Sequence, residues 1–230
     1  MQTTDKQQKG YKGLAMEGII ARWYASIRRS GSQIEDWRKQ AAHLTGSLPD
    51  GADVLEVAPG PGYFAIEMAR LDRLHVTGLD ISHTFVEIAR ENARQAGVSV
   101  DFQQGNTSNM PFAEGSFDLI ICQAAFKNFS QPSKAINEMY RVLRGGGMAV
   151  IQDMWKDAPN MTIREEVKPM RLNPVNAFMT RKALEMLRRR AYTKEQFERL
   201  ATASAFGGCE IETSGIGIEV RLKKQSSTPG

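Results

Sequence analysis

The sequence has few of the features that mark secreted, membrane or disulfide-stabilised proteins. Its 230 residues include only two cysteines, Cys122 and Cys209, which stand far apart. Two isolated cysteines exclude a disulfide framework, a CxxC redox centre and a cysteine-based zinc site. No run of 18 apolar residues is present, and no apolar segment follows the first charges of the N-terminus. These absences exclude a helical membrane span, argue against a secretory signal and favour a reducing, cytoplasmic location.

The excess of one sign of charge is also small. The chain has 30 basic and 26 acidic residues, a net charge of +4, which is too small to indicate nucleic-acid binding by itself. Its three histidines, His43, His75 and His83, are scattered, so we expect structural or exposed positions for them and no metal site. The apolar fraction of 41% and the charged fraction of 24% are normal for a globular protein. This length can bury a core without cross-links.

Short apolar runs alternate with helical patterns through the middle of the chain. We expect strands at 53–58, 75–79, 98–103, 117–123 and 148–152. Helical patterns lie between them at 63–70, 85–95 and 133–143, and the last ends at three glycines, 145–147. This alternation predicts βαβ units and a parallel sheet, which the nearly continuous apolar strands indicate is covered on both faces. Ligands bind such sheets beyond the carboxyl ends of the strands.

The two ends of the chain carry further elements. Helical stripes are predicted at 19–27 and 34–44. The segment 155–206 is longer than one crossover helix needs, and we expect Pro169 and Pro174 to break it, with helices at 178–190 and 197–205. A Thr-x-x-Gln capping pattern at Thr193 precedes the second of these helices. Residues 209–213 and 217–222 are predicted to form the last β-hairpin of the chain, with Gly215 in its turn.

The loop after the first strand is rich in small residues that let a ligand approach the backbone. Residues 60–65 satisfy G-x-G-x-x-A, with Asp80 about 20 residues on, as in dinucleotide-binding proteins. A pyrophosphate needs positive potential, however, and Glu56 near the loop entrance is a poor neighbour for it. A ligand with an ammonium and a sulfonium group, such as S-adenosylmethionine, suits that carboxylate better. An ordinary glycine-rich turn remains the alternative.

Five sequence boxes in the same order resemble those of the class I S-adenosylmethionine-dependent methyltransferases. The group that they resemble contains the ubiquinone/menaquinone C-methyltransferases (methyltransferase type 11). The boxes are 56–62, 76–82, 105–112, 116–120 and 141–147. One departure is mild: Ala58 occupies the slot of the first glycine. The resemblance implies a Rossmann-like, doubly wound α/β fold with a seven-stranded, mostly parallel sheet, an antiparallel last strand and helices on both faces.

The resemblance also implies which residues contact S-adenosylmethionine. Asp80 would accept both ribose hydroxyls, Ile81 would pack on the adenine, and Asn106, where relatives often have Asp, would accept from the adenine amino group. The backbone at Gln123 would face the methionine part. The expected cofactor-binding residues are Glu56, Ala58, Pro59, Gly60, Gly62, Asp80, Ile81, Gly105, Asn106, Thr107 and Gln123. The alternatives are a helix cap for Asp80, a turn for Asn106 and a solvated strand end for Gln123.

Catalytic residues are harder to assign. Many relatives carry histidines after the fourth strand, where this chain has FKNF at 126–129, so no histidine base is expected there. Lys127 either touches substrate or lies on the surface, and Asp153 either orients substrate, acts as a base or is a loop residue. Tyr24 is a further candidate. Because the sulfonium already activates the methyl group, aligning donor and acceptor for SN2 transfer is the main requirement.

The predicted organisation is a lid on a methyltransferase domain. Residues 1–48 would supply N-terminal helices of the lid, and 49–230 the domain, with a helical insert at about 155–206. An apolar wall, or alternatively ordinary core, would come from Trp23, Tyr24, Met161, Met170, Met179 and Met186. The basic residues at 181–190 suit a helix C-terminus, and an RNA or anionic-substrate surface is the alternative.

The predicted function is methyl transfer to a small aromatic or apolar acceptor. Three alternatives stay open: an RNA or protein methyltransferase, a non-catalytic S-adenosylmethionine-binding module, and an NAD(P)-linked oxidoreductase.

Overall fold

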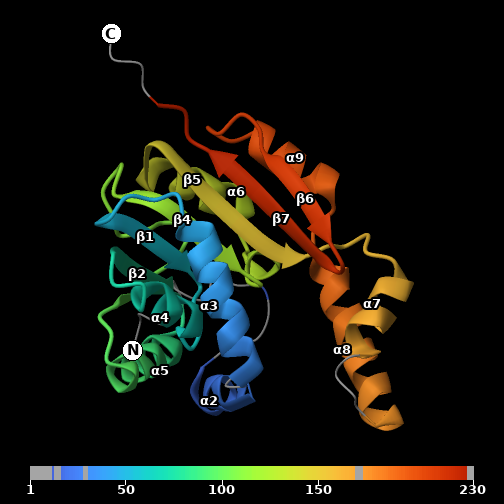
Figure 1. Cartoon of the computed structure of the whole chain (residues 1–230). Helices are drawn as coiled ribbons and strands as arrows, with labels where there is room; N and C mark the ends of the chain where they lie inside the picture. Colours follow the sequence, from blue (N-terminus) through green and yellow to red (C-terminus); the bar gives the residue numbers. More distant parts are fainter. Residues whose placement is uncertain (1–11, 13–16, 28–30, 169–172, 227–230) are drawn as a thin grey trace, which may run out of the picture.

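The computed structural model describes residues 12, 17–27, 31–168 and 173–226 and has a seven-stranded sheet at its centre (Figure 1). The strands are β1 (Ala52–Val57), β2 (Leu74–Asp80), β3 (Asp101–Gln104), β4 (Phe117–Gln123), β5 (Leu143–Met154), β6 (Glu210–Ser214) and β7 (Gly217–Lys223). Their order is β3-β2-β1-β4-β5-β7-β6. The pairs from β3 to β5 are parallel, and β7 runs antiparallel to β5 and β6. The predicted Rossmann-like fold is confirmed.

Helices cover both faces of this sheet. α3 (Gly31–Thr45), α4 (Tyr63–Ala69) and α5 (His83–Ala96) pack on one face, and α6 (Pro132–Val142) and α9 (Lys194–Thr202) on the other. The remaining helices are α2 (Gly18–Ile27), the 3₁₀ turn η2 (Phe126–Asn128), and α7 (Asn160–Val167) and α8 (Pro174–Arg190), which stand away from the sheet in Figure 1. The predicted capping box at Thr193 is present at the start of α9. In the described residues no helix combines the length and apolar character that a bilayer crossing requires.

The strands are apolar on both sides because each side faces a different core. In β4, Leu119 and Ile121 join the cluster formed with α3, α4 and α5. The intervening Ile120 and Cys122 join the cluster formed with α6 and α9. Side chains that alternate along a strand in this way pin its register, because a slip of one residue would exchange the two faces. Packing on both faces therefore fixes which residues of β4 reach the carboxyl edge of the sheet.

Some predicted boundaries differ from the structure. β5 begins at Leu143, so the three glycines that we expected in a turn lie within the strand, where the β4–β5 register shifts between Phe117 and Leu119. A Cβ at Gly147 would lie 2.9 Å from the Asp118 carbonyl oxygen, so glycine permits this close approach. β3 starts at Asp101 rather than at residue 98.

The helices of the insert after β5 also differ from those predicted from the sequence. Pro174 does not break a helix but begins α8, and the Asn173 side chain caps it by accepting from the Asn176 backbone N–H. Proline is tolerated in the first turn because its missing N–H has no partner there. Helix α7 was not predicted, and Pro169 lies outside the described residues.

Candidate functional site

The order of the strands reverses between β1 and β4, and the loop after β1 lies at this point. Such a reversal is where open α/β sheets bind ligands. The loop turns sharply, with left-handed φ values of 56° at Ala58, 54° at Gly60 and 79° at Gly62. The Ala58 N–H donates to the Leu79 carbonyl (2.8 Å), and the Gly62 N–H donates to the Pro59 carbonyl (3.0 Å). The loop ends at the N-terminus of α4.

The two glycines of this loop serve different purposes. A Cβ at Gly62 would lie 2.6 Å from Phe102 Cζ and 2.8 Å from Ala89 Cβ, so Gly62 lets α4 pack against its neighbours. A Cβ at Gly60 would meet nothing within 4 Å. Gly60 therefore faces open space, and a ligand can approach its backbone there.

Asp80 at the end of β2 faces the same loop. Its Oδ2 accepts from the Gly60 N–H (3.0 Å) and its Oδ1 from the Ser82 N–H (2.8 Å). Burial raises the pKa of Asp80 to about 6, although these two hydrogen bonds lower it. Ser82 caps α5 by accepting from the Phe85 N–H at 3.1 Å, so the alternative of Asp80 as the helix cap is wrong.

Glu56 is the least satisfied group at this edge. Its side chain is buried in β1, and within the described part of the chain its Oε2 has no hydrogen-bond partner. Burial raises its pKa to about 8, against a hydrogen bond from the Ala65 backbone, and the charge of Asp80 raises it further. A buried acceptor without a partner is costly. A cationic ligand would satisfy it, whereas a pyrophosphate would be repelled, which disfavours the dinucleotide alternative.

The loop after β3 closes the far side of Asp80. The Gly105 N–H donates to the Asp80 carbonyl oxygen (2.9 Å). Asn106 Oδ1 accepts from the Ser108 N–H (2.9 Å), so its side chain shapes this turn. An amide oxygen has a second lone pair, and the adenine contact of Asn106 stays a prediction. Ile81 and Thr107 are half-buried, and their cofactor contacts also stay predictions.

Lys127 and Asp153, which the sequence offered as separate catalytic candidates, form a buried ion pair. The Nζ of Lys127 lies 2.7 Å from Asp153 Oδ1, and the two side chains are 7% and 3% exposed, so the surface alternative for Lys127 is wrong. Lys127 Nζ also donates to the carbonyl of Ala124, which has a left-handed φ of 53°. Asp153 accepts from the backbone N–H groups of Lys127 and Met154 as well. The pair thus fixes the turn after β4.

The side chain of Gln123 belongs to a polar network and not to a solvated strand end. Its Nε2 donates to Gln152 Oε1 (2.8 Å), which also accepts from Gln40 Nε2 on α3 (2.8 Å). Gln152 Nε2 donates in turn to Glu219 on β7 (2.6 Å). The network ties an N-terminal helix to the carboxyl ends of β4 and β5.

Glu17 is a residue of this edge that the sequence analysis missed. It accepts from the backbone N–H groups of His83 (3.0 Å) and Thr84 (3.1 Å) at the start of α5. Burial raises its pKa, but hydrogen bonds from Thr84, Ser82 and His83 outweigh this effect and the net shift is downward. No motif marks Glu17, because its partners lie 66 and 67 residues away. It anchors the N-terminal segment beside Asp80.

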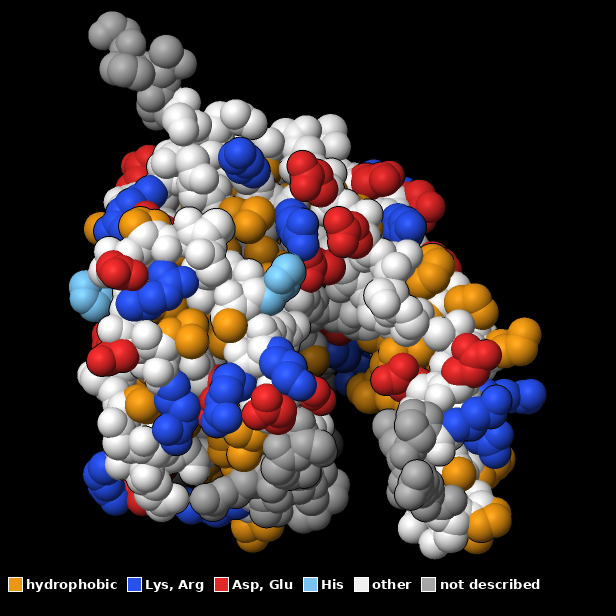
Figure 2. Space-filling view, viewed as in Figure 1, with side chains coloured by type: hydrophobic (Ala, Val, Ile, Leu, Met, Phe, Trp, Pro, Cys, Tyr) orange, Lys and Arg blue, Asp and Glu red, His pale blue; other side chains and the backbone are white. Residues whose placement is uncertain are grey.

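The residues predicted to line a lid are exposed where the structure describes them. Met161, Met179 and Met186 are 70%, 62% and 64% exposed, so the core alternative is wrong for these three. The side chains of Trp23 and Tyr24, and the whole of Met170, lie outside the described part. Figure 2 shows a recess between the body of the molecule and the limb formed by α7 and α8, and the carboxyl end of β5 points toward it in Figure 1.

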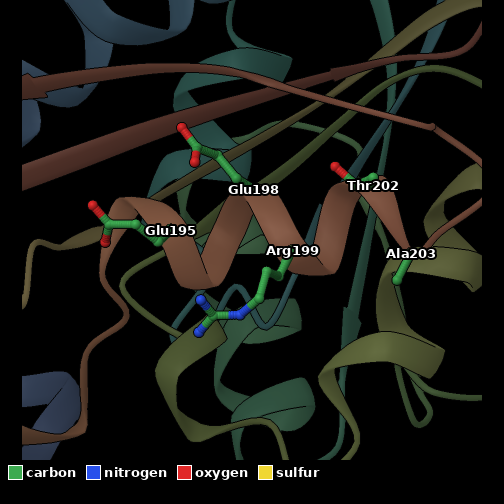
Figure 3. Close-up of a pocket in the computed structure, with 5 residues that line it drawn as sticks. All are labelled: Glu195, Glu198, Arg199, Thr202 and Ala203. Atoms are coloured by element: carbon green, nitrogen blue, oxygen red, sulfur yellow. The ribbon is translucent and has the colours of Figure 1, made fainter.

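A hollow on helix α9 carries no comparable chemistry. It is lined by Glu195, Glu198, Arg199, Thr202 and Ala203. Figure 3 shows Glu198 and Arg199 pointing to opposite sides of the helix, so the charged groups do not converge. We assign no site to it.

The comparisons with known proteins agree with this geometry. A family described as a methyltransferase domain matches residues 55–151. The demethylmenaquinone methyltransferase of Deinococcus radiodurans is 34% identical over 150 residues, which cover 64% of this chain and 62% of that protein. The ubiquinone/menaquinone biosynthesis C-methyltransferase UbiE of Haemophilus ducreyi is 26% identical over 171 residues, 67% of this chain and 66% of that protein. The matches thus span just under two thirds of these relatives.

The fold has matches among solved structures. A proposed S-adenosyl-L-methionine-dependent methyltransferase from Methanococcus maripaludis superposes with a TM-score of 0.72 at 20% identity, covering 94% of this chain and 97% of that one. At this identity the likeness concerns the fold. Together with the family match and the loop geometry, it leads to one assignment. Residues 55–151 match a methyltransferase domain, and the fold of the chain is that of a solved S-adenosylmethionine-dependent methyltransferase.

Proposed function

We propose that the protein transfers a methyl group from S-adenosylmethionine to a small apolar organic acceptor. The observation that carries the proposal is the buried Glu56 carboxylate, whose Oε2 has no partner in the described structure, beside Asp80 and the open side of Gly60. S-adenosylmethionine supplies an ammonium group and a sulfonium-activated methyl group. Two buried carboxylates at one sheet edge suit such a cation and not a phosphate chain.

The remaining binding roles follow from position. Asp80 would hold the ribose hydroxyls, because an ionised carboxylate accepts from two donors. The loop at 105–107 and Ile81 would surround the adenine, and the backbone at Gln123 would border the methionine part. Glu17 would reinforce Asp80 by fixing the start of α5 beside it. The loop at 58–60 would contact the donor through its backbone.

We infer that alignment, and not a strong general base, drives the transfer. Asp153 is ion-paired with Lys127 Nζ and accepts from two backbone N–H groups, which hold its carboxylate in place at the turn after β4. A carboxylate held in this way positions its neighbours instead of removing a proton. Alignment can supply roughly 7–11 kcal/mol in favourable cases. A base is needed only for an acceptor that must first lose a proton, and Tyr24 remains the candidate for that role.

We propose a quinone-like ring as the acceptor. Support comes from the names of the relatives, which act on demethylmenaquinone or in ubiquinone/menaquinone biosynthesis. A flat apolar ring could enter the recess between the body and the α7–α8 limb. The N-terminal helices (1–48) and the insert (about 155–206) would then exclude water, which blocks side reactions.

Methyl transfer is tested directly with radiolabelled S-adenosylmethionine. We expect label to move into a demethylated naphthoquinol supplied in detergent, and little label to move with Asp80→Ala, which should remain folded but bind the donor weakly. Binding of the donor without transfer to any quinol, or to a metabolite extract, would favour a non-catalytic binding module. Binding of NAD(P) without binding of S-adenosylmethionine would refute the proposal.

A further inference from the structure

Helix α8 exposes apolar side chains to an unusual degree. It is 17 residues long, and none of the side chains described along it is buried. Val175, Phe178, Met179 and Met186 are 71%, 51%, 62% and 64% exposed. α8 packs on α7 through its other side, where Arg188 hydrogen-bonds to the Ala158 carbonyl and to Asn160 Oδ1. Clustered apolar exposure of this kind marks an interaction surface.

Cations share this exposed face. Residues 175, 178, 179, 182 and 186 follow helical spacing, so Lys182 lies within the apolar stripe, and Arg189 and Arg190 continue it. All three cations are exposed. The acidic residue of α8 is Glu185, which pairs with Lys182 at 2.9 Å. We call the face formed by Val175, Phe178, Met179, Lys182, Met186 and Arg189 the α8 face.

The combination of apolar and cationic side chains on the α8 face favours one kind of binding partner over the others. A second copy of the chain, docked face to face, would bring like charges together. A nucleic acid would use the cations but would leave the apolar side chains in water. A small neutral acceptor would leave the cations without a partner. An anionic bilayer surface satisfies both, because apolar side chains enter the acyl boundary while lysine and arginine reach the headgroup phosphates.

We propose that the α8 face binds the surface of a membrane that contains anionic lipids. Figure 1 shows α7 and α8 as a limb that stands away from the sheet. The α8 face lies along this limb, so a flat bilayer surface can contact its apolar and cationic side chains together. The proposal is independent of the methyl-transfer activity.

Vesicle flotation with the full chain tests the proposal. We expect the protein to float with vesicles of phosphatidylcholine and phosphatidylglycerol and to float much less with phosphatidylcholine alone. Phe178→Ser combined with Met179→Ser, or Arg189→Glu alone, should weaken partition roughly fivefold or more, since each cation near the surface is worth about fivefold. The matched control, Lys134→Glu at an exposed position of α6, should float like the wild type.

Each variant is checked for its thermal midpoint and for S-adenosylmethionine binding, both of which should be unchanged. Failure of the wild type to float with anionic vesicles would overturn the proposal. So would equal loss of partition in Lys134→Glu, because net charge alone would then explain it. A concentration-dependent dimer in light scattering that Phe178→Ser dissolves, without vesicle binding, would assign the face to a second copy instead.

Discussion

Glu56 is a single residue that lowers the stability of the free protein and is proposed to strengthen ligand binding. Its pKa in the folded protein, about 8, lies above the ordinary glutamate value of 4.5, so the folded state holds the proton more tightly than the unfolded state. Stability of the free protein should therefore fall as pH rises from about 4.5 to about 8. A bound cation favours the ionised form and offsets that loss.

Glu56→Gln should separate these two effects. We expect it to raise the thermal midpoint of the free protein at pH 8, to flatten the midpoint between pH 6 and pH 8, above the range in which Asp80 titrates, and to weaken S-adenosylmethionine binding about tenfold or more. Scanning calorimetry across this pH range and titration calorimetry at pH 8 measure these changes. A midpoint that keeps the wild-type pH dependence between pH 6 and pH 8 would show that Glu56 is not the group that titrates in this range.

Gly60 and Gly62 form a matched pair of positions that separates binding from packing. Both have left-handed φ, so alanine costs about 1–2 kcal/mol of unfolding free energy at either one. Gly62→Ala should cost about 1–3 kcal/mol more, because its Cβ would collide with Phe102 and Ala89. Gly60→Ala should instead weaken donor binding, since its Cβ fills open space. Equal donor affinity in Gly60→Ala and the wild type would move the ligand away from this loop.

One ion pair, between Lys127 and Asp153, stabilises the turn between β4 and η2. Lys127→Met would leave Asp153 buried and without its cation, and we expect a loss of about 3–5 kcal/mol in unfolding free energy. Combining it with Asp153→Asn removes the unpaired charge and should recover part of the loss. Urea denaturation of the two single variants and the double variant measures the coupling. Additive losses would mean that the two residues do not act as a pair.

The whole molecule should respond to the donor through its N-terminal helices. Glu17 and Gln40 connect these helices to α5 and to β5, so donor binding beside Asp80 should stabilise them. We expect slower hydrogen exchange in α2 and across 155–190 when S-adenosylmethionine is bound, and little change in α6, which lies in the opposite layer. Equal protection in both states would argue against the lid.

The strands of the sheet could be predicted because each one has an apolar pattern within its own sequence. Runs such as Phe117–Gln123 are apolar on both sides, and the structure places a core on each side. The Lys127–Asp153 pair was not predictable, because each residue alone resembles a loop residue and their partnership depends on how β4 and β5 meet. Glu17 was missed for the same reason. Local patterns reveal elements, whereas these contacts arise from the packing of distant segments.

The place of β7 in the sheet has a consequence for how the chain is made. β7 follows every other strand in sequence but lies between β5 and β6. A nascent chain therefore carries β5 with an open edge, including Val150 and Ile151, until residues 217–223 leave the ribosome. Open apolar edges invite pairing with other chains. Synthesis of this protein thus passes through an interval, ended only by β7, in which chaperones are most needed.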